Sequence, residues 1–471
     1  MLHTREFSSF AVIFENRKMV KSRETLNQVL SLMTVCLNEF ALGVGNGWIP
    51  PTLSILQNSG AEKSLTMEEA SWIASLEHIG KIFGALLTAF LLDIIGRKKL
   101  LTFSALSFAA MWCGILCSKS VLIIYLSRIL FGLAYGVNDG TNSVYLGENS
   151  SPIVRGVFGS VTISLYYFGL LLELAVAGYF SVTTTAIINS VIMFSTFLCT
   201  FWMVEPAQFL LMKGKSERAK KNFLWLKGVR DISEVQHEFE KIQQNANAEI
   251  TKKSSYMKIF TSPANYKSVL IMFAVYVMSG STGYYPIMSF ASVTFSSTEI
   301  LTQNQLIILF GICQFVVGMV TSFVIDKFNR RSIMLVGYTM ICIVHAFTAI
   351  LYYVQDNLTQ IPYFPWLTFV SITVYAMIYA FVYPAVFLIR SELFPLSVKA
   401  VGGCIAVVGY SLMSFLMTKI FLYVSVNFGI HVNFIMFSCI SLTLAFFIYF
   451  LVPETRNKSL IEIQEILEKE N

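Results

Sequence analysis

Ion-pairing residues recur at two places where a long apolar segment gives way to a polar turn. The first copy reads Asp93-Ile-Ile-Gly-Arg97, and the second reads Asp326-Lys-Phe-Asn-Arg330. Each copy places a carboxylate four residues before a guanidinium, and these two groups form strong, charge-assisted hydrogen bonds. The copies are separated by about half of the 471 residues. A duplication at this spacing predicts a chain made of two repeated halves, each with an ion pair at the same end.

Further acidic and basic residues repeat in the same order along both halves. An acid precedes a base at equal spacing after the fourth and the tenth apolar segments, and another acid follows the sixth and the last. Parallel repeats of this kind occur in membrane transporters, where the substrate site lies near the membrane midplane between the two repeats. The repeated residues are Glu148 with Arg155, Glu392 with Lys399, and then Glu205 and Glu454.

The composition is that of a membrane protein. Hydrophobic residues make up 55% of the chain and charged residues only 13%, whereas about 25% of the residues in a soluble domain are charged. A bilayer-crossing helix needs about 20 apolar residues, and a helix satisfies its own backbone polar groups in lipid. The sequence therefore predicts an all-α membrane protein with twelve transmembrane helices. They are expected at residues 29–49, 72–92, 100–118, 121–146, 157–180, 184–204, 267–291, 302–325, 333–354, 364–389, 400–424 and 430–451.

The distribution of lysine and arginine predicts the orientation. If the N-terminus is cytoplasmic, the outer loops contain only Lys63 and Lys119, and the other loop bases lie inside. Basic residues concentrate in cytoplasmic loops, so both termini are expected in the cytoplasm. The net charge of +6 then reflects topology and attraction to anionic membrane lipid, and no nucleic-acid partner is expected. Asn357 begins an Asn-Leu-Thr sequon in a predicted outer loop and is expected to carry a glycan.

Five parts are expected along the chain. The eight cysteines lie inside or at the ends of predicted spans, where thiols usually pack as small hydrophobes. We therefore expect no disulfide, no metal site and no cofactor, and the lack of HExxH, GxSxG and P-loop patterns argues against an enzyme. Short helices are expected in the linker at 216–226 and 233–243. The parts are a cytoplasmic N-terminal tail (1–25), an N-terminal six-helix bundle (26–204), a cytoplasmic linker (205–266), a C-terminal six-helix bundle (267–452) and a cytoplasmic C-terminal tail (453–471).

Taken together, the motifs resemble those of the major facilitator superfamily, and specifically of its sugar-porter family. The resemblance covers essentially the whole membrane part of the chain and implies two pseudo-symmetric six-helix halves. Pro50-Pro51, late in the first span, is most similar to the insect facilitated trehalose transporters. The motifs that carry the resemblance are Asp93 with Gly96-Arg97-Lys98, Arg128-Ile-Leu-Phe-Gly132, Glu148 with Arg155-Gly156, Glu205, Asp326 with Arg330-Arg331, Glu392-Leu-Phe-Pro395, and Pro453-Glu454-Thr455-Arg456.

The resemblance implies that the charges at helix ends form a cytoplasmic gate. Acids and bases on the two halves pair when the inner side is shut and separate when it opens. Each exposed pair contributes about 0–1 kcal/mol, but several together can shift an equilibrium between states that differ by a few kcal/mol. If the bases were only topological anchors, the acids would remain unexplained. The expected gate residues are Asp93, Arg97, Arg128, Glu148, Arg155 and Glu205 in the first half and Asp326, Arg330, Glu392, Lys399 and Glu454 in the second.

The substrate-contacting positions depart from the sugar-porter pattern. Most of the amides that would bind sugar hydroxyls are replaced, and a site that reads hydroxyls loses affinity when its partners become apolar. Aromatic side chains with a hydroxyl can instead bind a sugar ring or a less polar solute, although ordinary helix packing explains each of them equally well. The expected substrate-binding residues are Asn46, Trp48, Tyr276, Thr282, Tyr284, Gln314, Phe387 and Tyr410.

Ionisable residues inside the predicted spans are candidates for function. Glu77 and Lys81 stand at positions i and i+4 of the second span, with the acid first, and are expected to pair. Arg390 lies near the inner end of the tenth span, where we expect it to extend to the membrane surface or to pair with Glu392. Glu39 in the first span has no obvious partner in its local sequence.

The resemblance also bears on energy coupling. Proton-coupled sugar porters have an aspartate in the first span at the position that matches Gly45 here, and its absence favours uncoupled transport. Glu39, six residues earlier, remains an alternative proton site.

The leading hypothesis is facilitative transport, or uniport, of a sugar such as trehalose or a hexose by alternating access. One alternative is a transport-poor sensor that kept the fold and lost the sugar site, and another is a carrier for a less polar, non-sugar solute. Solute flux, as opposed to binding without flux, separates the sensor from the carriers. The expected partners are a small-molecule solute and membrane lipid. The expected form is a monomeric, multi-pass protein of the plasma membrane.

Overall fold

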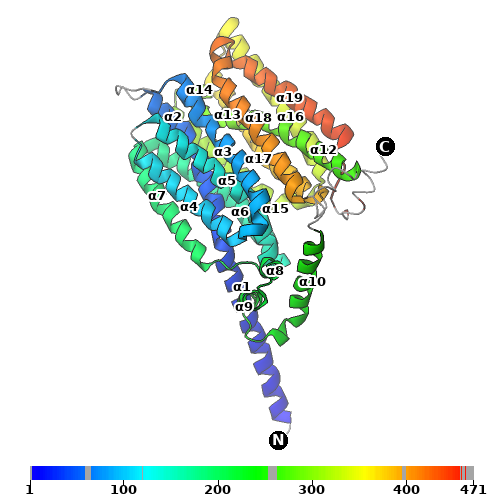
Figure 1. Ribbon diagram of the computed structural model, residues 1–471. Helices are drawn as coiled ribbons and strands as arrows, with labels where there is room; N and C mark the ends of the chain where they lie inside the picture. The colour runs from blue at the N-terminus through cyan, green and yellow to red at the C-terminus, as the bar shows by residue number, and fades with distance from the viewer. Residues whose placement is uncertain are drawn as a thin grey trace.

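The chain folds into a bundle of membrane-spanning helices (Figure 1). Eleven helical segments are long and apolar enough to cross a membrane. Large apolar side chains such as Phe90, Phe323 and Phe450 are exposed on the bundle surface, as expected for helices that face lipid. These features confirm the predicted all-α membrane fold, and the described residues contain no strand. The computed structural model describes residues 3–58, 65–118, 120–252, 263–394 and 399–456, together with 458 and 462.

The first predicted span is formed by two helices. Helix α1 (His3–Gly47) begins within the segment expected to be a tail and continues into the bundle, and α2 (Ile49–Asn58) follows after Trp48. Two prolines occupy the first turn of α2, where the backbone N–H groups have no helical partner and proline is tolerated. The N-terminal part of α1 projects from the bundle (Figure 1).

The seventh predicted span is a broken helix. Helix α12 (Pro263–Gly280) is followed by the short helices α13 (Tyr284–Ser289) and α14 (Ala291–Thr294). Between α12 and α13, Gly283 adopts a φ of 94°, a left-handed conformation that glycine adopts at little cost because it has no Cβ. This break explains why the segment is missing from the eleven continuous spans. Discontinuous membrane helices are common at transporter binding sites.

The remaining spans are single helices. In the first half they are α3 (Met67–Ile95), α4 (Arg97–Leu116), α5 (Val121–Asn149), α6 (Pro152–Tyr179) and α7 (Val182–Cys199). In the second half they are α15 (Gln303–Val324), α16 (Arg330–Asn357), α17 (Phe364–Leu393), α18 (Lys399–Asn427) and α19 (Ile430–Leu451).

The two halves have the same internal packing. In the first half α3 packs against α5, α1 against α6, and α4 against α7. The equivalent helices of the second half repeat these contacts, because α15 packs against α17, α12 against α18, and α16 against α19. Across the halves the main contacts are α3 with α18 and α6 with α15, two pairs that the same symmetry interchanges. The predicted pseudo-symmetric arrangement is therefore confirmed.

Helices α3 and α5 touch through their glycines. A Cβ atom at Gly132 would lie 1.8 Å from the carbonyl oxygen of Glu77, and one at Gly80 would lie 2.1 Å from that of Ile129. Small residues allow membrane helices to approach at this distance, where van der Waals contact replaces the hydrophobic driving force. The close approach brings the polar side chains of α3 and α5 within reach of one another.

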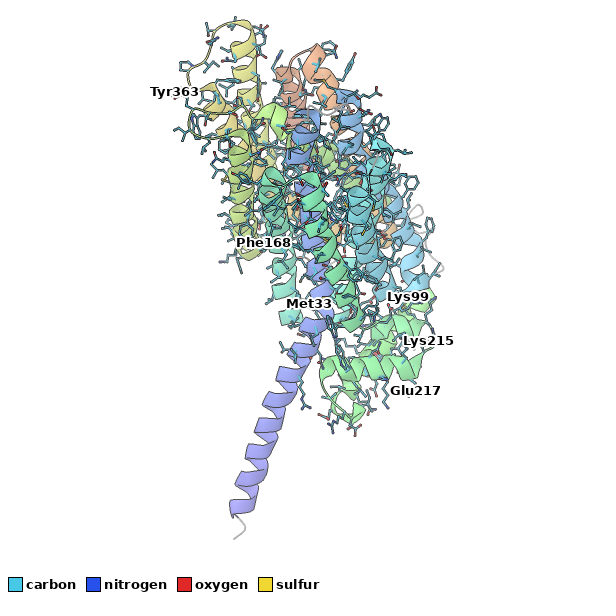
Figure 2. The ribbon with its side chains drawn as sticks, turned by 90° about the vertical axis from the view of Figure 1, so that its left-hand side faces the viewer. Met33, Lys99, Phe168, Lys215, Glu217 and Tyr363 are labelled. Atoms are coloured by element: carbon cyan, nitrogen blue, oxygen red, sulfur yellow. The ribbon has the colours of Figure 1, made fainter. Side chains whose placement is uncertain are left out.

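The linker contains three helices at one end of the bundle. Helices α8 (Ala207–Met212), α9 (Ser216–Lys227) and α10 (Gln236–Lys252) include the two that the sequence predicts. In Figure 2, Lys215 and Glu217 of the linker lie near the same end of the bundle as Lys99, while Tyr363 lies at the other. We call these the linker end and the far end.

Candidate functional site

The first half carries an ion cluster at the linker end. Arg97 is the first residue of α4, and its guanidinium lies 3.0 Å from the carboxylate of Asp93 on α3 and 3.0 Å from that of Glu148 on α5. Glu205, which follows α7, accepts hydrogen bonds from the backbone N–H groups of Arg97 and Lys98 at 2.6 and 3.1 Å. A carboxylate is favoured at a helix N-terminus, where N–H groups are otherwise unpaired. The cluster thereby ties together the ends of four helices.

The linker covers this cluster. The ring centroid of Phe209 on α8 lies 5.1 Å from the Arg97 guanidinium, and Asn222 on α9 donates a hydrogen bond of 2.9 Å to the backbone carbonyl of Glu205. Burial raises the pKa of Glu205 above its ordinary value, and the backbone N–H groups of Lys98 and Arg97 act in the opposite direction. The linker helices therefore contribute to the environment of the cluster.

The second half carries an equivalent cluster. Arg330 is the first residue of α16, and its Nε lies 3.6 Å from Glu392 on α17. Glu454, which follows α19, accepts hydrogen bonds of 3.1 Å from the backbone N–H groups of Arg330 and Arg331. The hydroxyl of Thr455 donates to Glu392 at 2.6 Å. The two clusters match residue for residue, and the contacts described here connect helices of one half.

Arg128 does not belong to the gate. It lies near the start of α5, about 30 Å along the helix from Glu148 at a rise of 1.5 Å per residue. Its guanidinium is fully buried, pairs with the carboxylate of Glu77 on α3 and donates to the carbonyl oxygen of Gly45 at 3.2 Å. The prediction that placed Arg128 among the gate residues is therefore wrong, because the direction of α5 puts this residue toward the far end.

Three other predicted gate residues have different outcomes. Arg155 lies at the linker end, but its exposed guanidinium donates to the carbonyl oxygens of Gly147 and Ser150, at 2.7 and 3.2 Å, rather than to a carboxylate. The side chains of Asp326 and Lys399 lie outside the described part of the structure.

Tyrosine side chains fill the space between the two halves. Tyr284 stacks on Tyr379 with 4.4 Å between ring centroids, and the hydroxyls of Tyr379 and Tyr410 are 2.9 Å apart. Tyr135 of the first half meets Tyr285 of the second, with 3.3 Å between their hydroxyls. Tyrosine combines an apolar ring face with a polar hydroxyl, so this surface can contact both parts of an amphipathic solute.

A small cavity lies among these residues. Its volume of 10 Å³ is about that of a single water-sized sphere, so the space is nearly closed in this conformation. Among the predicted substrate-binding residues, Asn46 donates to the hydroxyl of Tyr166 at 3.0 Å, and the hydroxyl of Tyr284 donates to Gln314 at 2.9 Å. The cavity is lined by Asn46, Ile49, Glu77, Tyr166, Leu170, Tyr284, Tyr285, Met288 and Ser289.

The other predicted binding residues divide into two groups. Tyr276 and Phe387 flank the guanidinium of Arg390, at 5.6 and 4.5 Å from their ring centroids. In contrast, Trp48 packs edge-on against Trp112 within the first half, at 6.0 Å, and the hydroxyl of Thr282 bonds to a carbonyl of its own segment. The structure therefore does not place the side chains of Trp48 and Thr282 in this cavity.

Three buried charges meet between the halves. The two carboxylate oxygens of Asp139 on α5 lie 3.7 Å from Lys81 Nζ and 3.6 Å from an Arg390 terminal nitrogen. The predicted pairing of Glu77 with Lys81 is wrong, because Glu77 pairs with Arg128 instead. Arg390 extends across to the first half rather than toward the membrane surface. Asp139 is missing from the predicted set, although the rule for charges inside a span would have identified it.

The other buried acids have amide partners. Glu39 accepts hydrogen bonds from Asn138 and Asn142, at 3.1 and 2.6 Å, and Glu173 accepts two of 2.9 Å from Asn189. Among the described residues, no group of His, Cys, Asp and Glu could hold a metal ion, and the eight cysteines are free.

The chain is similar to membrane transporters over nearly its whole length. The sequence profile described as "Sugar (and other) transporter" matches residues 26–467. The facilitated trehalose transporter Tret1 of Apis mellifera ligustica is 25% identical over 455 residues, covering 96% of this chain and 90% of that protein. The Tret1 of Culex quinquefasciatus is 23% identical over 444 residues, covering 93% and 86%.

Solved structures share the fold. The proton:xylose symporter XylE bound to 6-bromo-6-deoxy-D-glucose gives a TM-score of 0.75 at 18% identity, covering 94% of this chain and 100% of that chain. The inward open conformation of XylE from E. coli gives 0.74 at 17% identity, covering 92% and 98%.

Proposed function

Since the chain belongs to the sugar (and other) transporter family, we propose that it moves a sugar-like solute across the membrane by alternating access, without coupling to an ion gradient. The observation that carries this proposal is the duplication of the Arg97 cluster in the Arg330 cluster, at the same end of two equivalent halves. Two rigid halves that each brace their own helix ends can rock against each other as units.

The contacts between the halves suit such a motion. The main cross-half pairs, α3 with α18 and α6 with α15, are long helix–helix contacts that can slide or tilt, as in a shear movement. Between them lies the tyrosine-lined cavity, reached by residues of both halves. We place the linker end in the cytoplasm, in agreement with the basic residues there, so that the two ion clusters mark the inner gate.

The surroundings of Gly45 support uncoupled transport. A Cβ atom at Gly45 would lie 2.1 Å from the ring of Phe131, so this position has no room for the carboxylate that proton-coupled sugar porters have there. Glu39 is instead held by two asparagine amides. The names of the similar proteins make trehalose and hexoses the first solutes to test.

The test is uptake by proteoliposomes that contain the purified chain. We expect uptake that saturates, stops at the outside concentration and is unchanged by a protonophore, because no proton gradient drives it. Glu39→Gln should leave the pH profile of the rate unchanged. Accumulation above the outside concentration, abolished by the protonophore, would contradict uniport. Binding without any flux would favour the sensor instead.

A further inference from the structure

The buried charges between the halves are unequal in number. Lys81 comes from the first half and Arg390 from the second, and both face the single carboxylate of Asp139. Both distances, 3.7 and 3.6 Å, exceed those of direct N–H···O hydrogen bonds, which lie near 2.9 Å. Two cations thus share one acid loosely, so much of their hydrogen-bonding capacity is available to a ligand.

The charges around this group do not remove the imbalance at the two cations. Glu39 of α1 is close enough to interact electrostatically with both Lys81 and Asp139. Its Oε1, however, is engaged by the amides of Asn138 and Asn142 on α5. Arg390 is surrounded by rings instead of acids, with Phe387 and Tyr276 on its own half. An additional anion would therefore meet two poorly neutralised cations.

Other polar groups and rings nearby would complete a solute site. The hydroxyl of Tyr276 is buried and has no hydrogen-bond partner among the described residues, although its ring lies against Arg390. Lys81 Nζ lies 3.6 Å above the ring of Tyr135 and 5.5 Å from that of Tyr410. These rings lead toward Tyr285 and the small cavity. The site thus combines cations, an unused hydroxyl donor and aromatic faces suited to a sugar ring.

We infer that the transported solute carries a carboxylate, and that it is a sugar acid rather than a neutral sugar. The carboxylate would bind between Lys81 and Arg390, with charge-assisted hydrogen bonds, and the ring would lie against the tyrosines. Asp139 would then compete with the solute for the same two cations. This inference rests on the proposed transport function and specifies its substrate class. It also explains why the amides that would read neutral sugar hydroxyls are absent.

A solute bound in this way would link the two halves. One of its cations belongs to α3 of the first half and the other to α17 of the second. Closing the halves around the carboxylate would bring both cations within hydrogen-bond distance of it, so the anion would favour the closed form over the open ones.

The test compares D-glucuronate with D-glucose, which differ by the acid group. With the purified full-length protein, we expect saturable glucuronate binding in a thermal-shift titration and glucuronate uptake in proteoliposomes. Arg390→Gln and Lys81→Gln should each weaken glucuronate binding by about tenfold or more, as expected when a hydrogen-bonded charge is lost. Arg390→Lys should recover part of the affinity. Lys99→Gln, at an exposed position near the same end of the bundle as the linker, is the matched control.

Asp139→Asn separates an anion site from a structural ion pair. If Asp139 competes with the solute, removing its charge should tighten glucuronate binding several-fold. If the three charges only hold the halves together, Asp139→Asn should weaken binding as Arg390→Gln does, and that result would overturn the inference.

The outcomes also distinguish this inference from the transport proposal. Uptake of glucose or trehalose without glucuronate binding would overturn the sugar-acid inference and leave uniport standing. Glucuronate binding that depends on Arg390, without flux of any sugar or sugar acid, would support the anion site and overturn transport.

Discussion

Replacing Arg97 by alanine should lower the uptake rate by about tenfold or more, because hydrogen bonds between charged groups contribute about 1.5–3 kcal/mol. The guanidinium donates to Glu148 and Asp93 and touches Phe209 of the linker. Its loss leaves two acids with one partner fewer and frees the ends of α3 and α5 from α4. The half-bundle would then no longer move as a unit.

The measurement is the initial rate of uptake in proteoliposomes, normalised to the amount of reconstituted protein. Lys99→Ala is the control, since Lys99 is exposed two residues along the same helix. We expect Arg155→Ala to have a smaller effect than Arg97→Ala, because Arg155 bonds only backbone carbonyls within its own loop region. Equal rates for Arg97→Ala and the wild type would contradict a gating role for the cluster.

Replacing Arg128 by leucine should destabilise the protein severely. Removing one partner of a buried ion pair costs about 3–5 kcal/mol, because the remaining charge stays buried without a counter-ion. Arg128 and Glu77 are both buried between α3 and α5, where the glycine contacts leave no room for relaxation. We therefore expect a large fall in the melting temperature of the detergent-purified protein.

The double variant Glu77→Gln with Arg128→Leu identifies the cause. If the unpaired carboxylate is responsible, neutralising it should recover much of the lost stability. Arg155→Leu, which removes an exposed arginine, should leave the melting temperature nearly unchanged. A double variant as unstable as Arg128→Leu alone would show that packing around Arg128, rather than its charge, is what matters.

Much of the fold follows from the sequence because membrane helices are encoded locally. Long apolar runs and the basic loops identify the spans, and the repeated motifs identify the halves. The exception is the seventh span, where the Ser281–Gly283 break gives three helices instead of one. The hydropathy of the run is continuous there, so it does not reveal a change of backbone direction.

The site is less predictable because its partners lie on different helices. The sequence correctly brings Arg97 together with Asp93 and Glu148, since motif order places all three at one end. It fails for Lys81, whose partner, Asp139, is set by the angular position of α5 against α3 and not by a spacing of four along one helix. Arg390 fails for a similar reason, since its reach across to the other half depends on how the halves pack.

The central claim is that the two halves rock against each other, and distances between spin labels test it most directly. In a cysteine-free variant, labels at the exposed positions Lys99 and Lys327 report the linker end, and labels at Ser120 and Asn357 report the far end. Breaking the inner cluster with Arg97→Ala should lengthen the first distance and shorten the second within one population of molecules. If both distances lengthened together, or neither changed while uptake was lost, the two halves would not move as alternating gates.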